Sequence, residues 1–357
     1  MKKILLALSV VSLFAAKAHS QGCVAIRSTG GICSMTDHPD STMSSEGSWV
    51  FNANNRYFKS FRHFRGSEEQ KERLEANTEV INHQYALDLS LMRVFNNRWS
   101  AMIDIPVLAN GRSSLYEHGG KERHKMHSFG LGDIRFAVYR WLLNPEKSRN
   151  FNAQLGLGLK LPTGDFDYQD YYYNVGVDGA KELRTVDQSI QLGDGGTGIS
   201  AELNLFANVA KNTGVYGNFY YLSNPRGHNG VKTFRSSSYE AIMSVPDQYM
   251  ARAGVNYAVG KLIASAGARL EGIPVYDLIG GSGAFRRPGY IWSVEPGLTY
   301  QFGRMNVYAA VPAALYRKRT QSVPDKERTE ASPTKTRVNG DAAFADYSVN
   351  IGVSFKL

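Results

Sequence analysis

Seven charged residues stand within stretches of sequence that otherwise alternate between apolar and small polar residues. Both signs are present, so members of the set can form charge-assisted hydrogen bonds with one another. Such a set has two interpretations: a network that braces the structure, or a constriction that orients a passing solute. The seven residues are Asp88, Arg135, Glu202, Arg252, Arg269, Glu271 and Glu295.

The basic and acidic members of this set lie at comparable distances along the chain from short turn-forming sequences. We therefore expect Arg252, Arg269 and Glu295 to belong to one network. A strongly ion-selective pore more often carries a ring of one charge sign, so the mixed signs predict weak selectivity between anions and cations.

A nucleophile is the second chemistry to consider, and Ser223 in the run YLSNP at 221–225 is the candidate. The run approaches the His-x-Ser-Asn-Gly pattern of outer-membrane phospholipase. A serine nucleophile needs a base, but Tyr221 holds the histidine position and His228 lies farther along the chain. We expect no catalytic residue. Phosphate-cradling loops and zinc-type spacings are also missing from the sequence, so we expect no cofactor and no metal.

The start of the chain carries an export signal. Lys2 and Lys3 precede an apolar run over 4–16, and the small residues at 18 and 20 fit a cleavage site. We predict a signal peptide over residues 1–20.

Both cysteines follow in a predicted N-terminal periplasmic segment over residues 21–47. Export places Cys23 and Cys33 in a compartment that permits disulfides, so the two are a candidate disulfide pair.

No later apolar run approaches the roughly 18–20 residues that a membrane-spanning helix needs. Alternation with period two recurs instead, at the length of a membrane-spanning strand. In residues 151–161, Phe, Ala and Leu occupy the odd positions, and polar or small residues occupy the even ones, which places the two sets on opposite faces of a strand. Segments of this kind lie near 49–61, 79–94, 99–108, 131–141, 151–161, 197–209, 215–222, 249–259, 262–272, 290–302, 305–316 and 343–357.

Short turns and long polar connections alternate between these segments. Outer-membrane barrels have short periplasmic turns and long extracellular loops, whereas a soluble sandwich has no reason to separate the two kinds. We therefore predict an all-β fold over residues 48–357, namely a closed antiparallel up-and-down barrel of about twelve strands in the bacterial outer membrane. The long connections are expected near 63–78, 109–130, 162–196, 223–248, 273–289 and 317–342.

If the apolar faces contact lipid, the polar positions line the lumen. Beyond the seven charged residues, this alternation predicts that the lumen also receives Asp104, Gln154, Lys160, Asn204, Asn256, Tyr308, Tyr316 and Asp346.

The connection at 273–289 is unusual for a solvated loop because it contains Val275, Leu278, Ile279 and Phe285. Either it folds inward as a partial plug, hinged at its glycines, or it packs on neighbouring loops. The gating candidates are Asp277, Phe285, Arg286 and Arg287.

The formal net charge is +9, but the basic residues are scattered through polar loops, which argues against nucleic acid as a partner. We expect contact with outer-membrane lipid and anionic lipopolysaccharide. Phe355, third from the end in the last alternating segment, resembles the signal that the barrel-assembly machinery reads.

Two stretches resemble a known family. The run GLGDIR at 130–135 and the run LGLGLKLPTGD at 155–165 resemble outer-membrane proteins grouped under the meta-pathway of phenol degradation. Residues 269–290, 294–297 and 341–347 resemble transporter-like members. The resemblance implies a barrel related to channels for hydrophobic solutes, such as fatty acids and aromatic compounds, without identifying a substrate.

Taken with this resemblance, the sequence predicts a non-enzymatic, porin-like channel for passive uptake of small hydrophobic or aromatic solutes. The alternatives are a structural or adhesive barrel with a filled lumen and, less favoured, a phospholipase-like enzyme.

Overall fold

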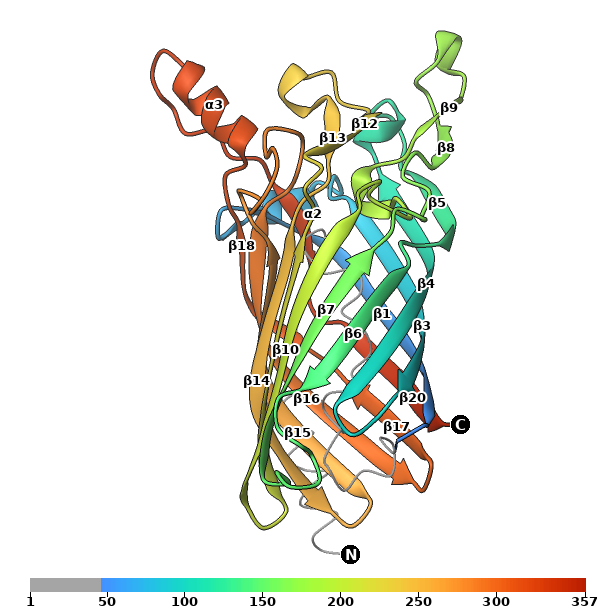
Figure 1. Ribbon diagram of the computed structural model, residues 1–357. Coiled ribbons are helices and arrows are strands. Elements are labelled where there is room, and N and C mark those ends of the chain that lie inside the picture. Colours follow the sequence, from blue (N-terminus) through green and yellow to red (C-terminus); the bar gives the residue numbers. More distant parts are fainter. Residues whose placement is uncertain (1–45) are drawn as a thin grey trace, which may run out of the picture.

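Twelve strands close into one antiparallel barrel in the computed structural model, which describes residues 46–357 (Figure 1). Each strand pairs on both sides, which satisfies its backbone N–H and C=O groups within the wall, as lipid requires. In order around the wall the strands are β1 (Trp49–Arg65), β3 (Ile81–Val94), β4 (Trp99–Ser114), β6 (Arg135–Trp141), β7 (Phe151–Lys160), β10 (Gly198–Ala210), β11 (Thr213–Ser223), β14 (Gln248–Val259), β15 (Leu262–Ile273), β16 (Gly289–Phe302), β17 (Met305–Ala310) and β20 (Val349–Lys356), which pairs with β1.

The predicted fold class is confirmed, and each predicted segment coincides with one of these strands. The predicted signal peptide and the cysteine pair Cys23 and Cys33 lie outside the described residues.

The long connections all lie at one end of the barrel, here called the loop end. At that end, three wall strands are each extended by a second strand after a short interruption of the β-structure. β5 (His124–Leu131) continues β6, β18 (Ala313–Arg319) continues β17, and β19 (Ala342–Ala345) continues β20. The loop predicted at 109–130 is therefore wrong in part, because β4 runs on to Ser114 and pairs there with β5.

Short elements decorate this loop end. They are β2 (Glu68–Glu69), α2 (Lys71–Glu75), β8 (Gln169–Tyr172), β9 (Glu182–Thr185), β12 (His228–Lys232), β13 (Ile242–Ser244) and α3 (Val323–Ala331). A reciprocal capping box starts α3, in which the Ser322 side chain accepts from the backbone N–H of Asp325 and the Asp325 side chain accepts from that of Ser322. No helix within residues 46–357 is long and apolar enough to cross a membrane.

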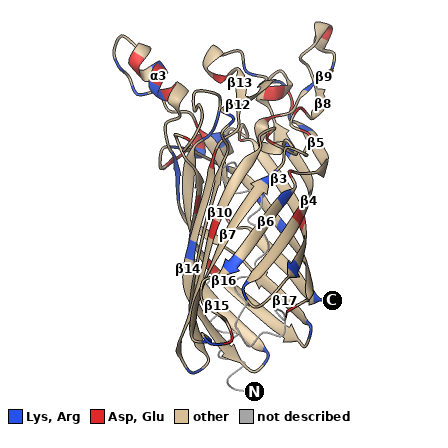
Figure 2. Ribbon diagram, in the orientation of Figure 1, with Lys and Arg blue, Asp and Glu red and all other residues tan. Residues whose placement is uncertain are grey.

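The two faces of the wall differ as the alternation predicts. In β7, Leu155, Leu157 and Leu159 are exposed on the outer face, whereas Asn152 and Gln154 are buried inside the barrel. Figure 2 shows charged residues on the wall strands partway along the barrel as well as in the loops.

A bulge reverses one prediction about the lumen. The pairing of β16 with β18 shifts by one residue, since Trp292 pairs with Tyr316 but Ser293 pairs with Ala314. When a strand contains one extra residue, every side chain beyond that point turns to the opposite face of the sheet. Tyr316 is therefore exposed on the outer face, not in the lumen as predicted, and Arg317 faces inward in its place.

The first and last wall strands, β1 and β20, meet at a seam that also includes β17. Inside it, Tyr308 and Ser354 both donate to the Asn52 side-chain oxygen, at 3.0 and 2.8 Å. The Tyr308 ring lies directly over Gly352, where an added Cβ would approach the ring to 2.2 Å.

Gly352→Ala should weaken this seam, because the ring must move away from Asn52 to make room. We expect the barrel to lose its heat-resistant migration on detergent gels at a lower temperature than the parent, with a cost of about 1–3 kcal/mol. Gly217→Ala is the matched control, because its Cβ would meet nothing nearer than 3.7 Å. Equal unfolding temperatures for the two variants would contradict the prediction.

Candidate functional site

The seven charged residues predicted for the lumen do face the interior of the barrel. Six are buried and Glu202 is partly exposed. They come from six wall strands, so the barrel brings together residues that are far apart in the sequence. We call this set, together with Asp104, the charged belt; its role as a constriction remains a prediction.

One part of the belt joins Arg252, Arg269 and Glu295 from the neighbouring strands β14, β15 and β16. Arg252 and Arg269 are direct cross-strand partners, an arrangement that repels unless anions intervene. Glu295 lies 3.1 Å from Arg269 and 3.5 Å from Arg252, and Glu271 lies 2.9 Å from Arg269. The structure thus places the three residues in the single network that the sequence suggested.

A second part of the belt is built around Arg135 on β6. Its guanidinium lies 2.9 Å from Asp104 on β4 and donates to the Tyr220 hydroxyl on β11 at 3.0 Å. Two further strands, β7 and β10, separate β6 from β11 in the wall. Arg135 therefore reaches across part of the lumen, a contact that strand alternation alone cannot reveal.

Asp88 and Glu202 are not part of either ion-paired group. Asp88 accepts from the Asn54 amide at 3.4 Å, and Glu202 accepts from the Tyr139 hydroxyl at 3.3 Å. The belt is therefore two ion-paired groups with two more carboxylates beside them, rather than one continuous ring.

Residues 186–196, here called the mouth loop, lie inside the barrel toward its loop end. The inward-facing side chains of Gln84 on β3 and Ser128 on β5 donate to its backbone carbonyls at Ser189 and Ile190, at 2.7 and 2.5 Å. Gln188 donates to the Ser244 carbonyl of β13 at 2.7 Å. The loop thus connects the inner wall at β3–β5 with the region of β13.

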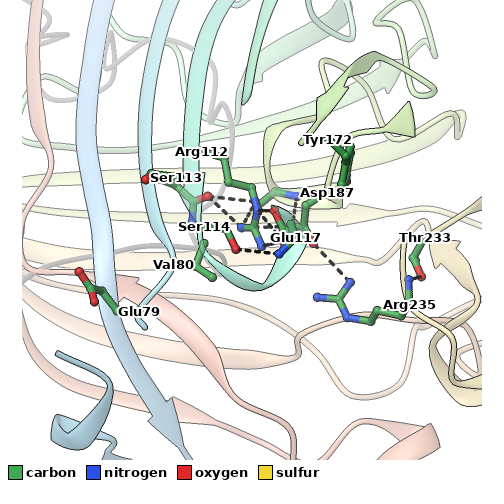
Figure 3. A network of polar contacts seen from close by, with 12 residues as sticks. Glu79, Val80, Arg112, Ser113, Ser114, Glu117, Tyr172, Asp187, Thr233 and Arg235 are labelled. Carbon is green, nitrogen blue, oxygen red and sulfur yellow. Dashed lines mark hydrogen bonds and ion pairs between the residues drawn. The ribbon is translucent and has the colours of Figure 1, made fainter. Parts of the chain in front are cut away.

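Asp187 holds the mouth loop through three arginines from separate elements. Arg287 lies 2.7 Å away, Arg235 3.3 Å and Arg112 3.5 Å. Arg112 also forms a bidentate pair with Glu117, and Figure 3 shows Arg112 and Arg235 converging on Asp187 from different parts of the chain.

Burial alone would raise the pKa of Asp187, but the three guanidiniums outweigh it and hold the pKa well below its ordinary value. The stability that this carboxylate contributes is therefore fully present above its unfolded-state pKa of about 3.9 and is lost only as the pH falls further, toward the depressed folded value. The mouth loop should stay ion-paired at neutral and mildly acidic pH.

The predicted gate at 273–289 is corrected in part. Leu278 and Ile279 are exposed to solvent at 73% and 55%, so they plug nothing. Phe285 and Arg286 are buried, and Arg286 pairs with Asp277 at 2.6 Å. Only the end of the segment turns inward, where Arg287 contacts Asp187 of the mouth loop.

Sequence reasoning missed the mouth loop and its partners Arg112 and Arg235, because it read 162–196, 109–130 and 223–248 as ordinary polar loops. A signal was present, since Val186, Ile190 and Leu192 are apolar residues in a polar run and all three are buried. Their arginine partners carry no comparable local signal.

The hydrolase candidate finds no support in the geometry. The Ser223 hydroxyl is buried and has no hydrogen-bond partner within residues 46–357. Tyr221, at the position where the pattern needs a base, donates to Asp247 at 2.8 Å.

Two cavities lie toward the loop end of the barrel, and residues of the mouth loop line the inner one. The inner cavity, of about 110 Å³, is lined by Arg135 and Tyr220 of the belt region and by Gln188 and Leu192 of the mouth loop. The outer cavity, of about 480 Å³, is lined by residues that include Arg112, Arg235 and Arg287. The outer cavity lies nearer the loop end, since its lining includes Arg112 and Ser114 of β4, whereas Pro106 and Leu108 of the same strand line the inner cavity.

Comparison with known proteins places this fold among outer-membrane barrels. No protein-family model and no curated protein sequence matches the chain. An outer-membrane channel from Pseudomonas putida F1 superposes with a TM-score of 0.61 at 12% identity, over 89% of this chain and 98% of that one. The chain thus shares that channel's fold.

More remote similarities were found to the P. putida toluene transporter TodX and the monoaromatic hydrocarbon channel CymD. Their TM-scores are 0.43 and 0.44 at 11% and 9% identity. Each covers 94% of this chain, and the matches span 98% and 94% of those chains.

Glu295→Lys should destabilise the barrel by about 3–5 kcal/mol, because it removes the shared anion between two buried arginines and adds a third cation. Adding Arg269→Glu should restore part of the loss by reversing the pair. Heat-resistant migration on detergent gels measures both effects. A double variant no more stable than the single one would show that the pair does not act as a unit.

Asp187→Asn should release the mouth loop, because three guanidiniums then face one another without their common anion. We expect chymotrypsin to cleave the folded barrel after Leu192, which is buried in the parent. Asp178→Asn is the matched control, because residue 178 lies on the exposed tip between β8 and β9 and already has a left-handed backbone that Asn tolerates. Identical digestion of both variants would contradict the role given to Asp187.

Proposed function

We propose that the protein is a passive channel of the bacterial outer membrane for small solutes with a hydrophobic or aromatic body. One observation carries the proposal: two cavities and a polar, mixed-charge belt follow one another along the inside of a barrel whose outer face is apolar. A solute entering at the loop end would meet the outer cavity, pass the mouth loop and reach the belt.

The proposal that the solute has an apolar body is based on the residues that line the inner cavity. Leu108, Leu192, Leu222 and Met243 line it beside charged groups of both signs, which are those of Asp133, Arg135, Lys160, Asp194, Arg286 and Arg287. Small-molecule sites commonly combine an apolar lining with a few polar groups that orient the ligand. This lining, with the resemblance to the phenol meta-pathway proteins, supports aromatic or hydrophobic solutes over sugars or inorganic ions.

A structural or adhesive barrel with a filled lumen is the second candidate. The observation that favours it is the density of buried ion pairs, since Asp187 fastens the mouth loop and the belt is braced by Glu295. In that case the long loops would carry the function, through contacts with lipopolysaccharide or another surface partner.

Single-channel recording in planar bilayers separates the two. A channel should give small conductance steps with a reversal potential close to zero in a salt gradient, because the belt carries both charge signs. Phenol or toluene should enter liposomes that contain the protein faster than lipid vesicles alone. Silent bilayers together with unchanged solute entry would reject the channel and leave the filled barrel.

A further inference from the structure

The outer cavity, here called the vestibule, is unusually rich in arginine. Its volume of about 480 Å³ lies within the range of roughly 300–1,000 Å³ that is common for small-ligand sites. Three of these guanidiniums hold Asp187 of the mouth loop, but passage of a neutral solute makes no use of their charge. The arginines that line the vestibule are Arg73, Arg112, Arg235, Arg287 and Arg319.

Among the described residues that line the vestibule, five arginines stand beside three carboxylates, which are Glu117, Glu240 and Asp341. The arginines also pair with Asp187 and Asp325, and Glu240 is shared with Arg328, which lies outside the lining. Asp187 serves three arginines, Glu240 serves two, and Asp341 also contacts His63. Burial and the nearby Arg287 lower the pKa of Arg235, as expected where guanidiniums are crowded.

One of these arginines has an unused donor. The Arg319 side chain is only 3% exposed, and its Nε has no hydrogen-bond partner among residues 46–357. A buried, charged donor without an acceptor is costly, so an acceptor brought by a ligand would be favourable.

Aromatic rings accompany the guanidiniums. Phe285 lies 4.2 Å from the Arg235 guanidinium and 5.0 Å from that of Arg287, and Phe234 lies 4.4 Å from Arg235. A guanidinium stacked on a ring still presents its N–H edge, which fits a carboxylate. The vestibule therefore offers both a flat apolar surface and donors for an anion.

We infer that the vestibule binds a small organic anion that combines a carboxylate with a planar apolar body, an aromatic carboxylate being the simplest form. The inference rests on the proposed channel, to which it adds an entry site and a class of solute. An inorganic anion would satisfy the arginines but make no use of Phe234 and Phe285. A neutral aromatic molecule would use the rings but bring no anion to the arginine-rich lining.

Binding of benzoate to the full chain in detergent micelles, followed by calorimetry, tests the site. Benzamide has the same shape without the charge and should bind far more weakly. Arg235→Gln should weaken benzoate binding by about tenfold or more, because it removes a charged donor. Arg184→Gln is the matched control, because Arg184 pairs with Glu182 in an exposed strand outside the vestibule.

A second variant tests the aromatic surface without changing charge. Phe285→Leu should reduce the preference for benzoate over cyclohexanecarboxylate while keeping affinity for the carboxylate. If Arg235→Gln does not fold, Phe285→Leu still tests the site. An unchanged preference for benzoate over cyclohexanecarboxylate in this variant would overturn the inference.

Absence of benzoate binding to the parent, equal binding of benzamide, or parental affinity in folded Arg235→Gln would each overturn the inference. Conductance without benzoate binding would reject the vestibule site and leave the channel. Benzoate binding without conductance would reject the channel and leave the vestibule as a binding site.

Discussion

The lack of hydrogen-bonding partners in lipid is the constraint on which this structure depends. Every backbone N–H and C=O group of the wall must find its partner inside the protein, so the strands close on themselves, and β20 pairs with β1 across the whole length of the chain. Closure in turn separates two environments. Apolar side chains take most of the outer face, and the charged belt is confined to a narrow interior.

Confinement explains why the interior is built from shared ion pairs. Arg252 and Arg269 lie directly opposite each other on neighbouring strands, and Glu295 lies within reach of both. On the other side, Arg135 balances Asp104 and uses Tyr220 as a further acceptor. Removing one partner of such a buried ion pair lowers the stability by more than the intact pair contributes to it, because the remaining charge stays buried without solvation.

Shared ion pairs also organise the loop end of the barrel, where they hold a loop instead of neighbouring strands. Asp187 draws together arginines from a wall strand and two connections, and it thereby fixes the mouth loop inside the barrel. The outer cavity is lined by more guanidiniums than carboxylates, whereas the inner one combines apolar side chains such as Leu108 and Met243 with polar and charged groups. A solute with one charged end and one flat apolar part would find complementary surroundings at both levels.

The sequence by itself determined the barrel, because period-two alternation is a local property that each strand carries independently of its neighbours. It also placed Arg252, Arg269 and Glu295 on the inner face. The tertiary structure alone decided which of them meet, where the bulge beside Tyr316 exchanges the two faces of β18, and which loop enters the mouth. These depend on contacts between residues far apart in the chain, such as Arg112 and Arg287 at Asp187, and no local pattern encodes them.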